Sequence, residues 1–90
     1  MSESDQPTGR QIAAARTLIG LPQAELANAA SISVPTLRRM EASGGPATGM
    51  KNNVEAVRRA LEAAGVEFIA ENGGGLGVRL RKPQKYSTGD

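Results

Sequence analysis

The sequence predicts a mainly α-helical domain of four helices that is followed by a C-terminal β-hairpin. Three observations lead to this prediction. Apolar residues recur at three- and four-residue intervals in segments between residues 8 and 64, which is the spacing of amphipathic helices. Beyond residue 65 the apolar spacing falls to two, as in a strand, and a run of glycines interrupts it. A chain of 90 residues is long enough for one domain with a small core.

The first two helices are predicted over residues 8 to 19 and 22 to 30. Thr8 suits the N-cap of the first helix, and Gly20 is a residue type that ends helices. Pro22 is expected in the first turn of the second helix, where its missing N–H group costs no hydrogen bond. The residues expected to face the core from these helices are Ile12, Ala15, Leu18, Ile19, Leu26, Ala27 and Ala30.

The third and fourth helices are separated by a glycine-rich loop at residues 43 to 49. Ser33 is predicted to cap the third helix, whose first turn can hold Pro35. The fourth helix is predicted from about residue 53 to residue 64, where Glu55 and Glu62 can pair with arginines on the exposed face. The expected inward residues are Leu37, Met40 and Glu41 in the third helix and Val54, Val57, Ala64 and either Ala60 or Leu61 in the fourth.

A hairpin is predicted over residues 65 to 82, with its turn at Asn72 and the glycines that follow. One apolar face is expected to consist of Val66, Phe68, Val78 and Leu80. The charged residues between them have two interpretations. Arg79, Arg81 and Lys82 either pair with Glu67 and Glu71 across the strands, which we favour, or contact a DNA backbone. The polar segments 1–7 and 83–90 are expected to be flexible tails around a domain at residues 8–64.

The composition excludes several classes of function. The chain has no cysteine, histidine or tryptophan, so thiolate or imidazole metal sites, disulfides and histidine-dependent catalysis are excluded. The carboxylates show no partner set for acid–base chemistry, and we expect neither enzyme activity nor a cofactor. No apolar run approaches the roughly 20 residues of a membrane span, and the acidic start is not a signal peptide. We therefore expect a cytoplasmic protein.

The second and third helices, joined by a tight turn, are the parts of a helix-turn-helix motif. The pattern is carried by Arg16, Gly20-Leu21, Gln23, Glu25-Leu26-Ala27, Ile32-Ser33, Thr36-Leu37, Arg39-Met40 and Glu41. In register over residues 11 to 64, this pattern resembles the Cro and phage-repressor family, also called XRE-type. Three departures are Pro22 for the usual serine or threonine cap, Ser31 for the usual turn glycine, and Val34-Pro35 for residues that are often polar.

The resemblance implies a sequence-specific transcriptional regulator that binds double-stranded DNA. It implies a structural ion pair between Arg16 and Glu41, and a phosphate contact from Gln23. Arg39 is our candidate for reading guanine. Lys51 and Asn52, expected just before the fourth helix, are equally consistent with phosphate contacts and with plain loop residues. The positions implied for the major groove are Ser33, Val34, Pro35, Thr36, Arg38 and Arg39.

The hairpin suggests how the protein associates. Because an isolated two-stranded hairpin is marginal in water, its apolar face must pack on something. We expect the face formed by Val66, Phe68, Val78 and Leu80 to bind a second copy, giving a homodimer that represses from a pseudo-palindromic operator. The alternative is a protein-binding antitoxin or anti-activator, in which DNA binding is secondary. Single-stranded nucleic acid is disfavoured because only Phe68 and Tyr86 could stack on bases.

Overall fold

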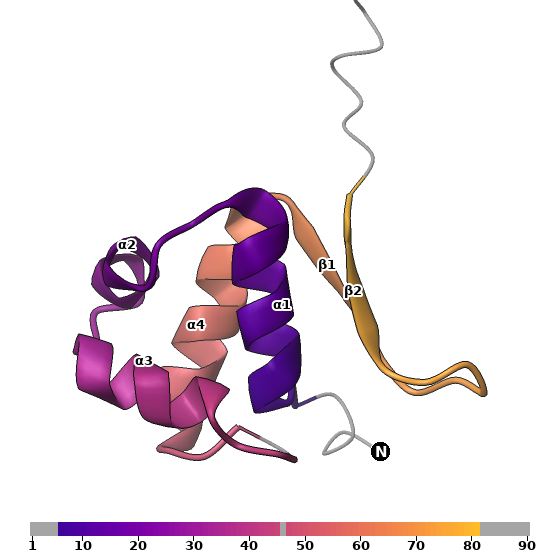
Figure 1. The fold of residues 1–90 in the computed structure, drawn as a ribbon, viewed down its shortest axis with the longest axis horizontal. Coiled ribbons are helices and arrows are strands. Elements are labelled where there is room, and N and C mark those ends of the chain that lie inside the picture. The colour runs from indigo at the N-terminus through magenta and orange to yellow at the C-terminus, as the bar shows by residue number, and fades with distance from the viewer. Residues whose placement is uncertain (1–5, 46, 82–90) are drawn as a thin grey trace, which may run out of the picture.

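The computed structural model describes residues 6–45 and 47–81. The predicted fold class is confirmed: a mainly helical domain carries a C-terminal antiparallel hairpin. The elements are α1 (Gly9–Ile19), α2 (Gln23–Ala29), α3 (Val34–Glu41), α4 (Lys51–Ala63), β1 (Val66–Ile69) and β2 (Gly77–Leu80). Figure 1 shows α1 and α4 side by side in the middle, with α2 and α3 on one side of them and the hairpin on the other.

The helix caps form as predicted, with one shift. Thr8 and Gln11 make a reciprocal capping box, with Thr8 N donating to Gln11 Oε1 (2.9 Å) and Gln11 N to Thr8 Oγ1 (3.0 Å). Gly20 ends α1 in the left-handed region at φ 67°. Ser33 Oγ accepts the Thr36 N–H group. Pro22 lies at the N-cap of α2, one residue outside the first turn in which it was expected.

Helix α4 begins two residues earlier than predicted, because the N–H groups of Asn53 and Val54 both donate to Met50 O (2.9 and 3.0 Å). Ala64 is the exposed C-cap, so its prediction as an inward residue is wrong. Val54, Val57 and Leu61 form the buried stripe, which decides for Leu61 over Ala60. On the outer face Arg58 pairs with Glu55 and Glu62, as the spacing predicted.

One continuous core joins all four helices and the start of the hairpin. Leu18, which was predicted to be inward, is 45% exposed, so that prediction is wrong. Pro7, assigned to a flexible tail, is buried, and its carbonyl accepts the Ala47 N–H group (3.1 Å). Gln6 is half-buried, and the rest of the predicted tails, residues 1–5 and 83–90, lies outside the described residues, as does position 82. The buried apolar residues are Ile12, Ala15, Leu26, Ala27, Ala30, Leu37, Met40, Ala47, Val54, Val57, Leu61 and Val66.

The hairpin pairs Val66 with Leu80, Glu67 with Arg79, and Phe68 with Val78. The favoured cross-strand ion pair is present, with Arg79 Nε 3.1 Å from Glu67 Oε1. Its hydrogen bond and charge lower the pKa of the Glu67 carboxyl. Arg81 was also expected to pair with Glu67 or Glu71 across the strands, but among the described residues it forms an ion pair with neither.

Arg81 instead closes the end of α4. Its Nη2 donates to Glu62 O (2.7 Å) and its backbone N–H to Gly65 O (2.7 Å). Glu62 O also accepts the Gly65 N–H group (3.0 Å), and Gly65 follows the C-cap Ala64, so the two bonds from Arg81 reinforce the turn that ends α4. The arginine thereby anchors the last residue of the hairpin to the helix that precedes it.

The turn between α2 and α3 places Ser31 at φ 58°, a left-handed conformation that costs a non-glycine residue about 1 kcal/mol. We expect Ser31→Gly to raise the free energy of unfolding by about 0.5 kcal/mol, since glycine relieves the strain but loses more chain entropy on folding. Urea denaturation checks this. Ser31→Ala, which keeps a β-carbon in the left-handed region, should not stabilise. Equal stabilities for Ser31→Gly and Ser31→Ala would contradict the strain argument.

Candidate nucleic-acid interface

Helices α2 and α3 are fixed to each other by a short turn. The N–H group of Ser31 donates to Asn28 O (3.1 Å), and that of Ile32 donates to Ala27 O (2.9 Å). Ala27 is 2% exposed and Leu37 is fully buried, so both helices rest on the shared core. A residue much larger than alanine at position 27 would force this core apart. The buried residues therefore fix the orientation of α3, and the residues on its exposed face take no part in that packing.

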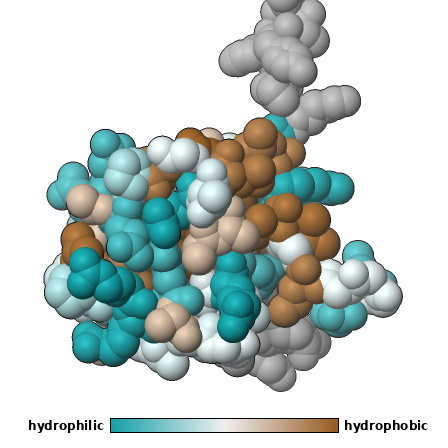
Figure 2. All heavy atoms as spheres, viewed as in Figure 1, coloured by the Kyte–Doolittle hydropathy of each residue, from teal (hydrophilic) through white to brown (hydrophobic). Residues whose placement is uncertain are grey.

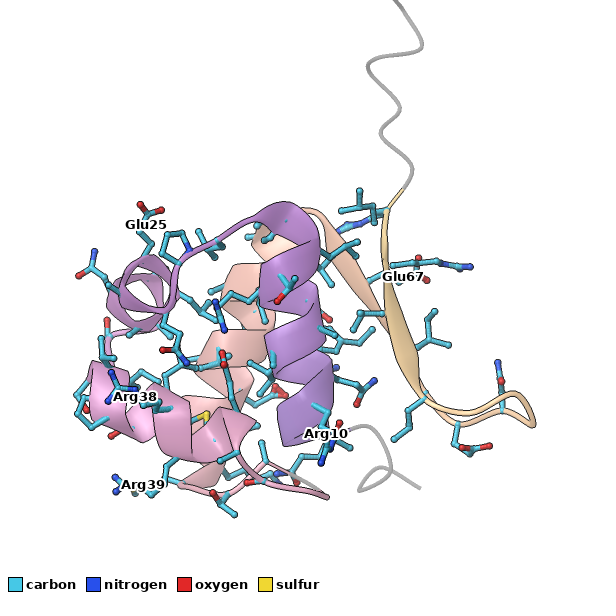
Figure 3. All side chains as sticks on the ribbon, in the orientation of Figure 1. Arg10, Glu25, Arg38, Arg39 and Glu67 are labelled. Atoms are coloured by element: carbon cyan, nitrogen blue, oxygen red, sulfur yellow. The ribbon has the colours of Figure 1, made fainter. Side chains whose placement is uncertain are left out.

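The exposed face of α3 carries the cluster that the sequence predicted. Pro35, Arg38 and Arg39 are exposed, and Val34 and Thr36 are half-buried. Within the described part of the chain, neither arginine side chain makes an ion pair or a hydrogen bond. Figure 3 shows both arginines on α3, on the opposite side of the molecule from the hairpin. The face thus presents two unpaired guanidinium groups to solvent.

The two hydroxyl groups at the start of α3 are bonded to each other. Ser33 Oγ donates to Thr36 Oγ1 at 2.9 Å while it accepts the Thr36 N–H group at 3.2 Å. Ser33 is exposed. The Ser33 hydroxyl therefore caps the helix and has no proton left for another acceptor. The hydroxyl proton of Thr36 remains available to an acceptor outside the protein.

The structural ion pair between α1 and α3 lies behind this face. Arg16 Nε donates to Glu41 Oε2 at 2.8 Å and Arg16 Nη2 to Glu41 Oε1 at 3.0 Å, a two-pronged contact. The hydrogen bond to Glu41 raises the pKa of the Arg16 guanidinium. Arg16 Nη1 also donates to Leu21 O (3.2 Å). The side chain of Glu41 is only 8% exposed, so the carboxylate is shielded from solvent and its role is structural.

Gln23 joins this network. Its Nε2 donates to Glu41 Oε1 at 3.0 Å, so one of its two amide protons is committed within the domain. The sequence assigned this side chain to a DNA phosphate. In the structure the side chain also bridges the start of α2 and the end of α3, and this leaves one amide proton and the carbonyl oxygen for other contacts.

Lys51 and Asn52 occupy the first turn of α4 and are not loop residues, which corrects their predicted position. Both are exposed, and the N-cap residue Met50 supplies no side-chain hydrogen bond to the helix. The loop before them is ordered by Ser43 Oγ, which accepts the Thr48 N–H group (3.1 Å). Lys51 therefore adds an exposed cation within the first turn of α4, the helix that follows α3.

The hairpin face predicted to bind a second copy is largely used within the domain. Val66 is fully buried, and Phe68 and Val78 pack against the core. The reason is that β2 and α1 lie against each other, so this face covers the helices. Of the four predicted residues Leu80 remains exposed, at 53%. Leu18 and Leu76 are also exposed. Figure 2 shows hydrophobic surface over the hairpin and the adjoining helices, whereas the side of α2 and α3 is mostly hydrophilic.

The sequence analysis missed two residues that hold this arrangement together. Gln11 is a buried polar residue whose Nε2 donates to Gly77 O (2.9 Å) and Ile69 O (3.4 Å), which ties the hairpin to α1. Gly9 lies where a β-carbon would be 2.7 Å from Ser43 O and in still closer contact with Met40 O. One signal in the sequence could have identified Gly9. Glycine has a lower helix propensity than alanine, so a glycine at the start of a helix indicates a position where a side chain does not fit.

Other kinds of site are not apparent in the described residues. No group of three or more acidic residues that could hold a metal ion occurs in ranges 6–45 and 47–81. A small pocket of about 80 Å³ lies between Pro7, Gln11, Arg58, Phe68 and Leu76, on elements other than α3. No described helix is long and apolar enough to cross a membrane. No protein-family model and no curated protein matches the chain.

Proposed function

We propose that this protein is a sequence-specific regulator of transcription that binds double-stranded DNA through α3. The observation that carries the proposal is the two-sidedness of this helix. Leu37 and Met40 on one side are fully buried, while Arg38 and Arg39 on the other are exposed and form no ion pair with any described residue. An arginine pair on a rigidly held surface helix suits the major groove, which admits one helix and rewards guanidinium groups.

The exposed side chains of α3 make different contacts with the DNA. Arg39 pairs with guanine O6 and N7 in a two-pronged contact, and Arg38 reaches a second base or the adjoining phosphate. Val34 and Pro35 contact thymine methyl groups, and Thr36 donates its free hydroxyl proton. Direct hydrogen-bonded reading therefore depends mainly on the two arginines.

Phosphate contacts fix the helix in the groove from both sides. Lys51 and Asn52, exposed in the first turn of α4, donate to the backbone that passes the end of α3. Gln23 donates its remaining amide proton to the other backbone while its bond to Glu41 holds it in place. These contacts set register and orientation, and they weaken on all sequences alike when removed.

The protein acts as a homodimer on a pseudo-palindromic operator and represses transcription by covering it. A symmetric dimer places two α3 helices in successive major grooves, about 34 Å apart. Exposed Leu18 on α1, Leu76 before β2 and Leu80 on β2 offer apolar surface for self-association. We assign the dimer contact to these leucines because Val66, Phe68 and Val78, which were expected to form it, pack in the core of the domain.

The experiment that tests this function is selection of bound duplexes from a random DNA pool, followed by titration of the selected duplex at several salt concentrations. An inverted repeat with a steep salt dependence supports a dimeric operator-binding protein. Sedimentation at micromolar concentration tests the dimer by itself. If no motif emerges and duplex binding stays weak at low salt, DNA recognition is refuted. A protein that co-purifies with the chain and needs the hairpin would then support the antitoxin or anti-activator alternative.

Arg39→Ala should cost about 1–3 kcal/mol of binding free energy per half-site of the selected duplex and relax the preference at one base position in each half-site. Arg59→Ala is the matched control, because Arg59 is an exposed arginine on α4 that has no ion pair in the described part of the chain. It should leave the preference unchanged. Fluorescence anisotropy against the selected and single-mismatch duplexes measures both. Equal losses for Arg39→Ala on selected and random DNA would refute its role in reading a base.

A further inference from the structure

Arg10 is a cation for which the fold gives no structural reason. It lies in the first turn of α1, is exposed, and makes no ion pair or hydrogen bond with any described residue. That turn contains no acidic residue. The partial positive charge of a helix N-terminus makes a cation there unfavourable. Its presence therefore lowers the stability of the helix, and no contact from residues 6–45 or 47–81 compensates for it.

The first turn of α1 is fixed against the end of α3 and the loop that follows. Gly9 N donates to Gly45 O (3.1 Å), and the Gly9 backbone lies so close to Met40 O and Ser43 O that no side chain fits between them. The guanidinium of Arg10 is thus carried by an element in direct contact with the arginine-bearing helix. Figure 3 shows Arg10 and Arg39 along the same lower edge of the molecule, where the loop between α3 and α4 runs.

We propose that Arg10 extends the nucleic-acid interface onto α1 and binds a DNA phosphate beside the site that α3 reads. This inference rests on the proposed function. The backbone that Lys51 meets at the start of α4 continues along the same edge of the molecule, and Arg10 neutralises one further phosphate there. A contact to phosphate alone adds affinity and salt dependence without sequence preference.

The test compares Arg10→Gln, Arg10→Lys and Arg59→Gln with the wild-type chain, by titrating the selected duplex over a range of salt concentrations. Because each subunit of the proposed dimer loses one phosphate contact in Arg10→Gln, the slope of log K against log salt should fall by about 0.9 per subunit, or about 1.8 for the dimer on the selected duplex. The ratio of affinities for selected and mismatched duplexes should not change. Arg10→Lys should keep the wild-type slope, and Arg59→Gln, on the exposed face of α4, should keep it as well.

The outcomes separate this inference from the function on which it rests. If the wild-type chain binds the duplex and Arg10→Gln keeps its salt slope, the phosphate contact is refuted and DNA recognition stands. If Arg59→Gln reduces the slope equally, the effect is one of overall charge and the contact is again refuted. If the wild-type chain does not bind duplex DNA, both proposals fail. Thermal unfolding provides a folding control, since Arg10→Gln should be no less stable than wild type because it removes a cation from a helix N-terminus.

Discussion

Gly9→Ala is expected to lower the free energy of unfolding by about 3 kcal/mol, a large part of the stability of a domain of this size. The added methyl group would lie 2.7 Å from Ser43 O and in still closer contact with Met40 O. Both are backbone atoms, so no side-chain rotation relieves the clash. The first turn of α1 would have to move away from the end of α3 and weaken the hydrogen bond from Gly9 N to Gly45 O.

Chemical denaturation monitored by circular dichroism measures this loss, with Gly44→Ala as the matched control. Gly44 is exposed, and a β-carbon there meets nothing within 4 Å. Its substitution should change the stability by less than about 0.5 kcal/mol. If Gly9→Ala proved as stable as Gly44→Ala, the close approach of α1 to α3 would be refuted.

Gly9 also marks the limit of what could be predicted from the sequence. Helix propensity alone favours alanine over glycine inside a helix by about 1 kcal/mol, so local reasoning gives the opposite sign for this substitution. The close contact that reverses the sign joins residues more than 30 positions apart, Gly9 and Met40. Propensity and periodicity describe neighbours along the chain and contain no term for such a contact.

The local features of the fold could be predicted, because they depend on neighbours along the chain. Thr8, Gly20 and Ser33 act within one turn of the chain, and all three take their predicted roles. The helical periodicity also identified most of the core. It failed for Leu18 and Ala64. Leu18 is exposed although the next residue, Ile19, packs against the core, so Leu18 lies beside the buried stripe of α1, and Ala64 lies just beyond the last residue of α4.

The candidate interface divides in a similar way. The exposed positions of Arg38 and Arg39 followed from helical spacing, and the Arg16–Glu41 pair from the family resemblance. The partner of Gln23 did not follow from either, because a long polar side chain in the sequence fits a phosphate and a carboxylate equally well. The hairpin was placed correctly, but its apolar face was assigned to a second copy when its own helices were available to cover it.

Glu41→Ala should have the second largest effect, a loss of about 2–3 kcal/mol in the free energy of unfolding. This substitution removes the acceptor for Arg16 Nε, Arg16 Nη2 and Gln23 Nε2 together. The Arg16 guanidinium and the Gln23 amide then lose the acceptor for three of their hydrogen bonds. The loss should fall below that of a fully buried pair because the Arg16 side chain keeps 21% of its exposure to solvent, which screens the charge.

Glu55→Ala is the matched control for Glu41→Ala. Glu55 also pairs with an arginine, but both partners are more exposed and the distance is 3.7 Å, so its removal should cost about 0.5 kcal/mol or less. Denaturation of the two variants under the same conditions gives the comparison. Comparable losses for the two would mean that the Arg16–Glu41 pair contributes no more than a surface contact.

A double variant, Arg16→Met with Glu41→Met, separates the loss of a partner from the need for the pair itself. Because burying two charges is costly, two apolar side chains of similar length should recover much of the stability that Glu41→Ala loses. DNA affinity gives a second measurement on the same proteins. Glu41 joins α1, the start of α2 and the end of α3 through directional bonds, whereas two methionines fill the space without fixing an angle. We therefore expect the double variant to regain stability while its affinity for the selected duplex stays below that of wild type.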